Sequence, residues 1–263
     1  MMAVVVQRRV AAVVGALVAD AAAQPLHWIY NLEKLHALVG TREDVAFWDP
    51  SANPFYTLPC GALSGYGDQA FTILKSLVDS NGFDPENLKK STLECFGPNS
   101  KYENPVNAVY KDKADIAKKN AKYPIDGPWR HASIKEFLRN FAEGKEVTGA
   151  IDDEQIDCAL RVVPVVALYA GRPEMLSVAE QVIRQTQNND LAVAVGLTAS
   201  RLLEYYILHG PSDDAIDDVI RQLSTAGRSN PQELDTAMVA FLREVVRKKN
   251  VPHLQATKDF TNN

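Results

Sequence analysis

The sequence has little cysteine, few catalytic signatures and no strong excess of charge, and each shortage excludes a class of protein. Cys60, Cys95 and Cys158 are its three cysteines in 263 residues, far apart and odd in number. A disulfide framework or a zinc knuckle is therefore not expected, and reduced thiols are. The absence of a glycine-rich phosphate loop, a Gly-x-Ser-x-Gly elbow and a His-x-x-x-His pair argues against nucleotide-loop, serine-hydrolase and zinc-peptidase chemistry.

The charge balance and the N-terminal apolar run bear on partners and location. With Lys+Arg at 28 and Asp+Glu at 33 the net charge is −5, which disfavours nucleic acid as a partner. Residues 10–26 form an apolar run after Arg8 and Arg9, like a signal peptide or an anchor. Asp20 interrupts the run, Pro25 closes it, and it is shorter than the roughly 20 residues that a span needs. We therefore predict a buried helix in a cytoplasmic protein, without a membrane or nucleic-acid partner.

Hydrophobic periodicity predicts the fold class. Apolar residues recur at three- and four-residue spacing, and the alternation typical of strands is missing. We predict an all-α protein with one domain over residues 1–249 and a polar, fraying tail over 250–263. Residues 10–24 are apolar nearly all round, which predicts a fully buried helix. Further helices are predicted over 67–80, 85–96, 106–119, 133–141, 153–169 (kinked at Pro164), 174–186, 191–208, 213–224 and 232–249, with a long irregular loop over 40–66.

Four polar features within this helical pattern are candidates for chemistry. Asp20 lies inside an apolar helix, so its carboxylate must be either hydrogen-bonded or bound to a cation or ligand, and the sequence leaves both open. Asp68 lies at a helix start, which favours a helix cap, although a metal or phosphate also suits that position. His27 alone is more typical of a structural hydrogen bond. The polar residues 186–190 favour a turn and a helix cap over a binding site.

Four segments, in order, resemble the ADP-ribosylglycohydrolase family. Residues 13–26 resemble its opening Gly-Ala-Leu-Leu-Gly-x-Ala-x-Gly-Asp-Ala-Leu-Gly-x-Pro, and residues 66–70 (Tyr-Gly-Asp-Gln-Ala) fall where the family has Tyr-Thr-Asp-Asp-Thr. Residues 159–164 resemble Ala-Met-Arg-x-x-Pro, and residues 186–192 resemble Thr-His-x-His-x-x-Ala. The resemblance spans about residues 8–210. Within the family, residues 25–30 and the Tyr-Gly-Asp variant are most similar to the branch of J-type crystallins and selenoprotein J.

The resemblance implies a helical fold around a cleft, which in active members holds two magnesium ions and binds ADP-ribose. This chain departs from the ligand pattern: Gly67 and Gln69 flank Asp68, Gln187 and Asn189 replace two histidines, and the C-terminal Gly-Gly-Asp-Thr-Asp-Thr segment is not found. One carboxylate cannot offset two magnesium ions, so binding of magnesium is predicted to be weak or absent. No catalytic residue is predicted. The resemblance implies Asp68 as the metal ligand and, as substrate-binding residues, Asp20, His27, Tyr66, Gln69 and Asn188.

Three functions follow from this pattern. The first is a non-catalytic structural protein of the crystallin type, such as an eye-lens protein. The second is a metal-dependent hydrolase of ADP-ribosyl linkages with altered ligands, acting through Asp20, Asp68 and His27. The third is a module that binds an ADP-ribose-like small molecule without cleaving it. The resemblance also implies that the closing C-terminal helices of the family are missing, which predicts exposed apolar surface and a homo-oligomer.

Overall fold

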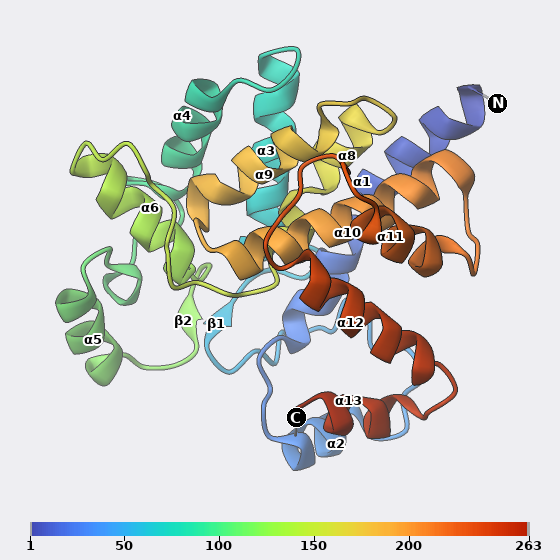
Figure 1. Cartoon of the computed structure of the whole chain (residues 1–263). Coiled ribbons are helices and arrows are strands. Elements are labelled where there is room, and N and C mark those ends of the chain that lie inside the picture. The colour runs from blue at the N-terminus through green and yellow to red at the C-terminus, as the bar shows by residue number, and fades with distance from the viewer. Residues whose placement is uncertain (1, 262–263) are drawn as a thin grey trace.

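The computed structural model describes residues 2–261, and almost all of its regular structure is helical (Figure 1). This confirms the all-α prediction. The first part of the chain contains α1 (Met2–Ala23), η1 (Gln24–Leu26), α2 (Leu32–Val39), α3 (Gly65–Asp79), α4 (Pro85–Phe96), η2 (Pro105–Asn107), α5 (Lys111–Asn120) and α6 (Ala132–Ala142). The second part contains α7 (Cys158–Arg161), α8 (Val163–Tyr169), α9 (Met175–Thr186), α10 (Asp190–His209), α11 (Ala215–Ser224), α12 (Asp235–Arg247) and α13 (His253–Thr261).

Helix α10 is the centre of the bundle. It contacts α1, α7, α8, α9, α11 and α12, and it runs through the middle of the view in Figure 1. Its N-terminus begins at Asn189, whose side-chain oxygen accepts hydrogen bonds from the backbone N–H groups of Leu191 and Ala192. The largest apolar core lies between α3, α7, α8, α9 and α10. The helix cap predicted within residues 186–190 is therefore present and fixes where the central helix starts.

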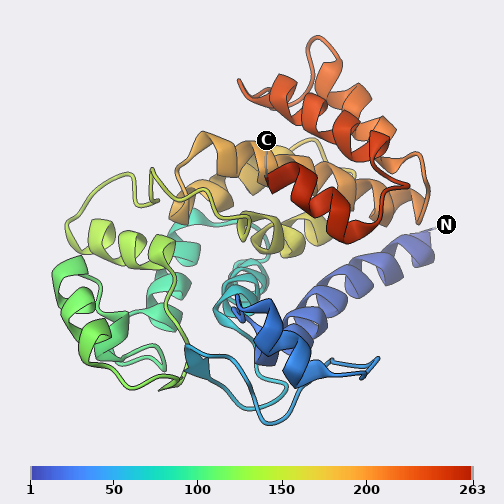
Figure 2. The same ribbon diagram turned by 90° about the horizontal axis from the view of Figure 1, so that it is seen from below.

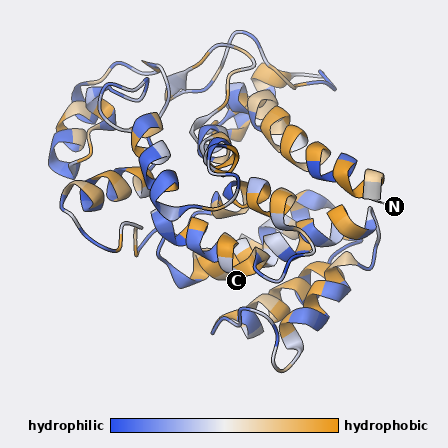
Figure 3. Cartoon of the chain, turned by 90° about the horizontal axis from the view of Figure 1, so that it is seen from above, coloured by the Kyte–Doolittle hydropathy of each residue, from blue (hydrophilic) through white to orange (hydrophobic). Residues whose placement is uncertain are grey.

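Helix α1 is half exposed, so the prediction of complete burial is wrong. Val10, Val14 and Val18 are 58%, 53% and 50% exposed on one face, and the apolar residues along α1 are visible in Figure 3. The opposite face packs on α3, α8 and α10. An apolar composition all round cannot say which face is covered, since that depends on how many elements pack against the helix.

Two arginines on the packed side join α1 to the ends of other helices. Arg8 donates a hydrogen bond of 3.2 Å to the backbone oxygen of Leu208 near the end of α10. Arg9 donates to the backbone oxygens of Leu168 and Ala170 at the end of α8, both at 2.7 Å. These guanidinium groups satisfy carbonyls that a helix C-terminus leaves unpaired. Figure 2 shows α1 crossing one side of the molecule.

The segment predicted as one kinked helix over 153–169 is two helices. The chain turns at Val162, and Pro164 occupies the first turn of α8, where its missing N–H breaks no helical bond. Residues 153–155 stay non-helical because the Asp153 carboxylate and the Gln155 carbonyl accept hydrogen bonds from Gln187 instead. The bend at Pro164 was predicted correctly, and the later helix start was not.

Two further segments differ from the prediction. The long loop over 40–66 contains β1 (Tyr56–Thr57), which pairs in parallel with β2 (Ile125–Asp126). The tail that was predicted to fray forms α13, which is held to α12 by an ion pair of 2.7 Å between Lys248 and Asp259. Ring contact between Phe241 and Phe260 adds an apolar part to this packing. Sequence polarity alone did not reveal this helix, because its packing depends on single contacts such as the Lys248–Asp259 pair and not on an apolar repeat.

Among residues 2–261, α10 is the one helix long and apolar enough to cross a membrane. Half of its most apolar window is buried inside the protein, as in a core helix. The three cysteines are free thiols, with Cys60 exposed and Cys158 buried, which agrees with the predicted lack of disulfides.

Candidate functional site

The candidate site surrounds the first turn of α3, where two glycines let other groups come close. The Ser64 hydroxyl caps the helix by accepting a hydrogen bond from the Tyr66 N–H. A Cβ atom on Gly67 would lie 2.2 Å from Oδ2 of Asp20, and one on Gly65 would lie 2.9 Å from the Trp129 carbonyl. Both distances are far below van der Waals contact. The Gly-Tyr-Gly sequence therefore allows the end of α1 and the loop before α6 to approach the helix start.

Asp20 is buried and fully engaged by neutral donors. Its Oδ2 accepts a hydrogen bond of 2.8 Å from the backbone N–H of Ser64, and its Oδ1 accepts one of 2.6 Å from the Ser64 hydroxyl. Such bonds to the charged carboxylate offset the loss of hydration. The hydrogen bonds expected of a buried structural carboxylate are thus present, and the substrate-binding role of Asp20 stays a prediction.

Asp68 is held by a cation and a phenol. Its Oδ2 lies 2.6 Å from Nζ of Lys101 and accepts a hydrogen bond of 2.5 Å from the Tyr102 hydroxyl. Burial of Tyr102, followed by the nearby Asp68 carboxylate, raises the pKa of Tyr102 well above its ordinary value, so the phenol keeps its proton and donates it. Asp68 is not the helix cap that its position favoured, because Ser64 caps α3.

Next to Asp68, Gln69 links two further buried groups. Its Nε2 lies 3.0 Å from Nδ1 of His131 and donates a hydrogen bond of 3.3 Å to Oδ2 of Asp157. The His131 ring stacks on Tyr66 with ring centres 4.0 Å apart. Burial, with smaller contributions from Arg161 and His27 against an opposing one from Asp153, lowers the pKa of His131 to about 3. The imidazole is therefore neutral at physiological pH.

His27 lies beside this group but makes weaker contacts. Its Nδ1 is 3.3 Å from the Tyr56 hydroxyl, and its ring meets Tyr66 edge-on at 5.9 Å. Burial lowers the pKa of His27, and the Asp20 carboxylate opposes that shift. The structure thus brings Asp20, His27, Tyr66, Asp68 and Gln69 together around one helix end.

A second buried network, centred on Arg161, was not among the predicted site residues. Nη2 of Arg161 donates to Oε1 of Gln187, and Nε2 of Gln187 donates to the Asp153 carboxylate at 2.8 Å. Nε and Nη1 of Arg161, Oδ1 of Asp157 and Oε1 of Gln69 are buried without a hydrogen-bond partner. Arg161 and Gln187 lie in the segments 159–164 and 186–192 that resemble the family, and this resemblance could have pointed to the network from the sequence.

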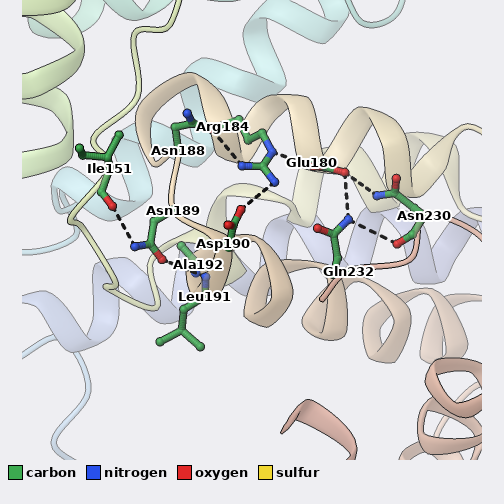
Figure 4. A network of polar contacts seen from close by, with 10 residues as sticks. All are labelled: Ile151, Glu180, Arg184, Asn188, Asn189, Asp190, Leu191, Ala192, Asn230 and Gln232. Atoms are coloured by element: carbon green, nitrogen blue, oxygen red, sulfur yellow. Dashed lines mark hydrogen bonds and ion pairs between the residues drawn. The ribbon is translucent and has the colours of Figure 1, made fainter. Parts of the chain in front are cut away.

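Asn188 lies apart from this cluster. Its side-chain oxygen accepts a hydrogen bond of 2.9 Å from Arg184, which also pairs with Glu180 and Asp190 (Figure 4). In the turn between α9 and α10, Gln187 takes the buried position and Asn188 joins this outer network. The substrate-binding role of Asn188 stays a prediction.

A cavity of about 540 Å³ opens beside the cluster, between α5, α6 and residues 150–155. The cavity is lined by five cationic side chains and by five carboxylates. The cations are Lys111, Lys118, Arg130, Lys135 and Arg139, and the carboxylates are Asp115, Glu136, Asp152, Asp153 and Glu154. Burial, with Lys118 and Arg130 nearby, lowers the pKa of Lys135 to about 8. Asp153 belongs both to the cavity wall and to the Arg161 network. The charged lining suits a polar small molecule.

The donor set does not fit a centre with two magnesium ions. Within the described residues 2–261, no group of three or more His, Cys, Asp or Glu side chains is placed to hold a metal ion. Asp68 is flanked by Gly67 and Gln69, and the ammonium group of Lys101 already lies against its carboxylate. Magnesium requires several oxygen ligands in near-octahedral geometry. Each oxygen of Asp20 already accepts a hydrogen bond from Ser64, which holds this carboxylate against the start of α3.

Comparisons with known proteins agree with this arrangement. A sequence model described as ADP-ribosylglycohydrolase matches residues 1–261. The chain is 34% identical to Crystallin J1A and 33% identical to Crystallin J1B of Tripedalia cystophora, each over 213 residues. Each alignment covers 81% of this chain and 62% of the relative, so the chain spans less than two thirds of these proteins.

A solved structure titled "ADP-ribosylglycohydrolase-related protein complex" shares the fold, with a TM-score of 0.53 at 18% identity. The superposition covers 92% of this chain and 76% of the other. The family is generally metal-dependent, whereas residues 2–261 contain no group of three or more His, Cys, Asp or Glu side chains placed to hold a metal ion. The match along the whole chain and the identity to the J-type crystallins show that this chain belongs to the ADP-ribosylglycohydrolase family.

Proposed function

We propose that this chain is a non-catalytic member of its family with a structural role of the crystallin type. The observation that carries the proposal is the ion pair between Asp68 and Lys101 at 2.6 Å, reinforced by the Tyr102 hydroxyl. The ammonium group of Lys101 thus lies against the carboxylate that would otherwise bind a divalent cation. Magnesium therefore competes with Lys101 for Oδ2 of Asp68, and the nearby ammonium charge also repels a divalent cation.

The surroundings of Asp20 support the same proposal. Its two oxygens accept bonds from Ser64, and Gly67 is packed against it, so the carboxylate serves the contact between α1 and α3. The similarity to two jellyfish proteins named crystallins supports a structural role. Cytoplasmic location, abundance in an eye lens and assembly into a homo-oligomer belong to the proposal.

A second candidate function is binding of an ADP-ribose-like molecule without cleavage. The cavity of about 540 Å³ favours it, because Lys111, Lys118 and Lys135 could face a diphosphate. The carboxylates of residues 152–154 oppose it, because they line the same cavity and repel phosphate. These opposing charges predict a weak affinity for ADP-ribose, which increases as the carboxylates are neutralised.

Magnesium titration by calorimetry tests the first proposal. We expect no saturable binding to the wild-type chain and measurable binding to Lys101→Ala, in which Asp68 loses its competing cation. Lys90→Ala removes an exposed lysine elsewhere and serves as the matched control, with no gain expected. Strong binding to the wild-type chain, together with magnesium-dependent release of ADP-ribose from a modified substrate, contradicts the proposal and favours the altered hydrolase.

Thermal shift with ADP-ribose tests the second candidate in the same preparations. A shift that disappears in Lys118→Ala and persists in Lys90→Ala supports a ligand in the cavity. No shift at millimolar ADP-ribose removes the binding module and leaves the structural role.

A further inference from the structure

A second cavity, lined by three arginines, lies on another part of the molecule. It has a volume of about 300 Å³ and is bounded by the start of α9, the middle of α10, the end of α11 and the loop before α12. Arg172, Arg201 and Arg228 all line it. It shares no lining residue with the cavity beside α5 and α6 and contains none of the residues around Asp20 and Asp68.

Arg201 is the buried member of this group, with 3% of its surface exposed. Its Nη2 donates to the Ser229 carbonyl at 2.8 Å, and its Nη1 reaches Oε1 of Gln222 at 3.5 Å. Its Nε is buried and has no partner. An unpaired donor on a buried cation is costly, because the desolvation of the group is not offset.

The other two guanidinium groups have limited neutralisation. Nε of Arg228 binds Oδ2 of Asp235 at 2.6 Å, and Arg172 lies over the ring of Tyr169 at 5.4 Å. One carboxylate, that of Glu204, also lines the cavity, but its Oε1 accepts a hydrogen bond of 2.7 Å from the backbone N–H of Gly171. With Asp235 included, three cations face two anions, which leaves an excess of positive charge.

The start of α9 also borders the cavity, with the Glu174 carboxylate at its N-cap and the Met175 N–H bonded to the Arg172 carbonyl. The helix has 12 residues, no acidic residue in its first turn and no side-chain hydrogen bond from its N-cap residue Glu174. Pro173, Met175 and Leu176 from this helix start line the cavity. The N-terminus of a helix favours an anion through its free N–H groups and its dipole.

From these observations we infer that the Arg172–Arg201–Arg228 cavity binds a phosphate-type oxyanion, either inorganic phosphate or the phosphate of a small monoester. Guanidinium groups match the tetrahedral oxygens of phosphate in pairs. The volume of about 300 Å³ exceeds that of a bare phosphate ion and leaves room for part of an attached molecule. This function does not depend on the one proposed for the Asp20 and Asp68 region.

Calorimetric titration of the 263-residue chain with inorganic phosphate and with AMP, at constant ionic strength, tests the inference. We expect saturable one-to-one binding that weakens about tenfold in Arg172→Ala, because one charge-assisted contact is lost. Arg172 is exposed and its side chain contacts Tyr169, so this variant should fold. Arg201→Lys keeps the positive charge but removes the paired N–H donors of the guanidinium group, and we expect a similar loss of phosphate affinity. Arg243→Ala removes a surface arginine elsewhere and should bind like the wild type.

The relative affinities for the two ligands identify the kind of anion that binds. Binding of phosphate and AMP with equal affinity identifies the free ion as sufficient, and tighter binding of AMP identifies a monoester. No saturable binding overturns the inference. Binding that is unchanged in Arg172→Ala but lost in Lys118→Ala also overturns it, because the anion then lies in the cavity beside α5 and α6.

Discussion

Asp20 and Asp68 lie beside the same turn of α3, but the protein satisfies them in different ways. Asp20 accepts bonds from a backbone N–H and a hydroxyl of one residue, Ser64. Asp68 instead binds the ammonium group of Lys101, whose side chain is 53% exposed, and the hydroxyl of Tyr102. Neutral donors fix a carboxylate by shape and burial, whereas an ion pair at the surface responds to salt and to competing cations. The contacts of Asp20 therefore serve mainly the packing of α1 on α3, whereas the Asp68 ion pair is the part of the site that salt and other cations can weaken.

The largest effect is expected where the Asp20 side is most crowded. Gly67→Ala places a Cβ 2.2 Å from Oδ2 of Asp20, and the chain must move or lose the bonds to Ser64. We expect the free energy of unfolding to fall by about 3 kcal/mol, measured by urea denaturation.

Gly15→Ala is the matched control, since its Cβ meets no atom within 4 Å on a helix. Its stability should stay equal or rise by up to about 1 kcal/mol. Equal effects of the two changes contradict the packing assigned to Gly67.

Lowering the pH tests whether His131 is neutral in the folded protein. Burial lowers the pKa of His131 to about 3, while the unfolded chain titrates near pH 6.5. Between these values the unfolded state binds more protons, so stability falls as pH falls below about 6.5. From pH 7 to pH 5 this group should account for about 2 kcal/mol of lost unfolding free energy.

The measurement is urea denaturation at both pH values for the wild type and for His131→Asn. The variant should show a smaller difference between pH 7 and pH 5. The same difference in both proteins means that His131 titrates normally in the folded state.

The smallest effect on stability is expected on the Asp68 side. Lys101→Ala removes a half-exposed ion pair and should lower the unfolding free energy by at most about 1 kcal/mol. Most of this loss should vanish in 1 M sodium chloride, because salt screens the wild-type pair. Lys75→Ala, which breaks the exposed pair with Asp79, is the control. A loss that exceeds the one in Gly67→Ala reverses the comparison of the two carboxylates.

Much of the helical fold could be predicted because its signals are local. The start of α4 follows from Asp84 as N-cap and Pro85 after it, and α3 begins and ends within two residues of its prediction. The exposed face of α1 was not predicted, because burial depends on neighbours that are distant in sequence. Helix α13 was missed because its segment is polar and lacks an apolar repeat, although it packs on the neighbouring α12.

The candidate site could be predicted only in part. Asp20 and Asp68 were singled out from their places in the helical pattern, whereas their binding roles and the choice of Gln69 came from the family resemblance. Lys101, Tyr102 and His131 were missed, since they come from loops 30 to 60 residues further along the chain. No local pattern marks a residue that reaches the site across such a separation.

The valine face of α1 has a consequence for concentrated solutions. Val10, Val14 and Val18 form an uncharged strip on the outside of the protein, next to an apolar groove with Leu74, Val78 and Leu168. A net charge of −5 gives only modest repulsion between molecules at physiological ionic strength. We expect contacts between such strips to make the second virial coefficient negative, so that light scattering per molecule rises with concentration. In concentrated solution we therefore expect this strip, rather than the stability of the fold, to limit how much of the protein stays dissolved.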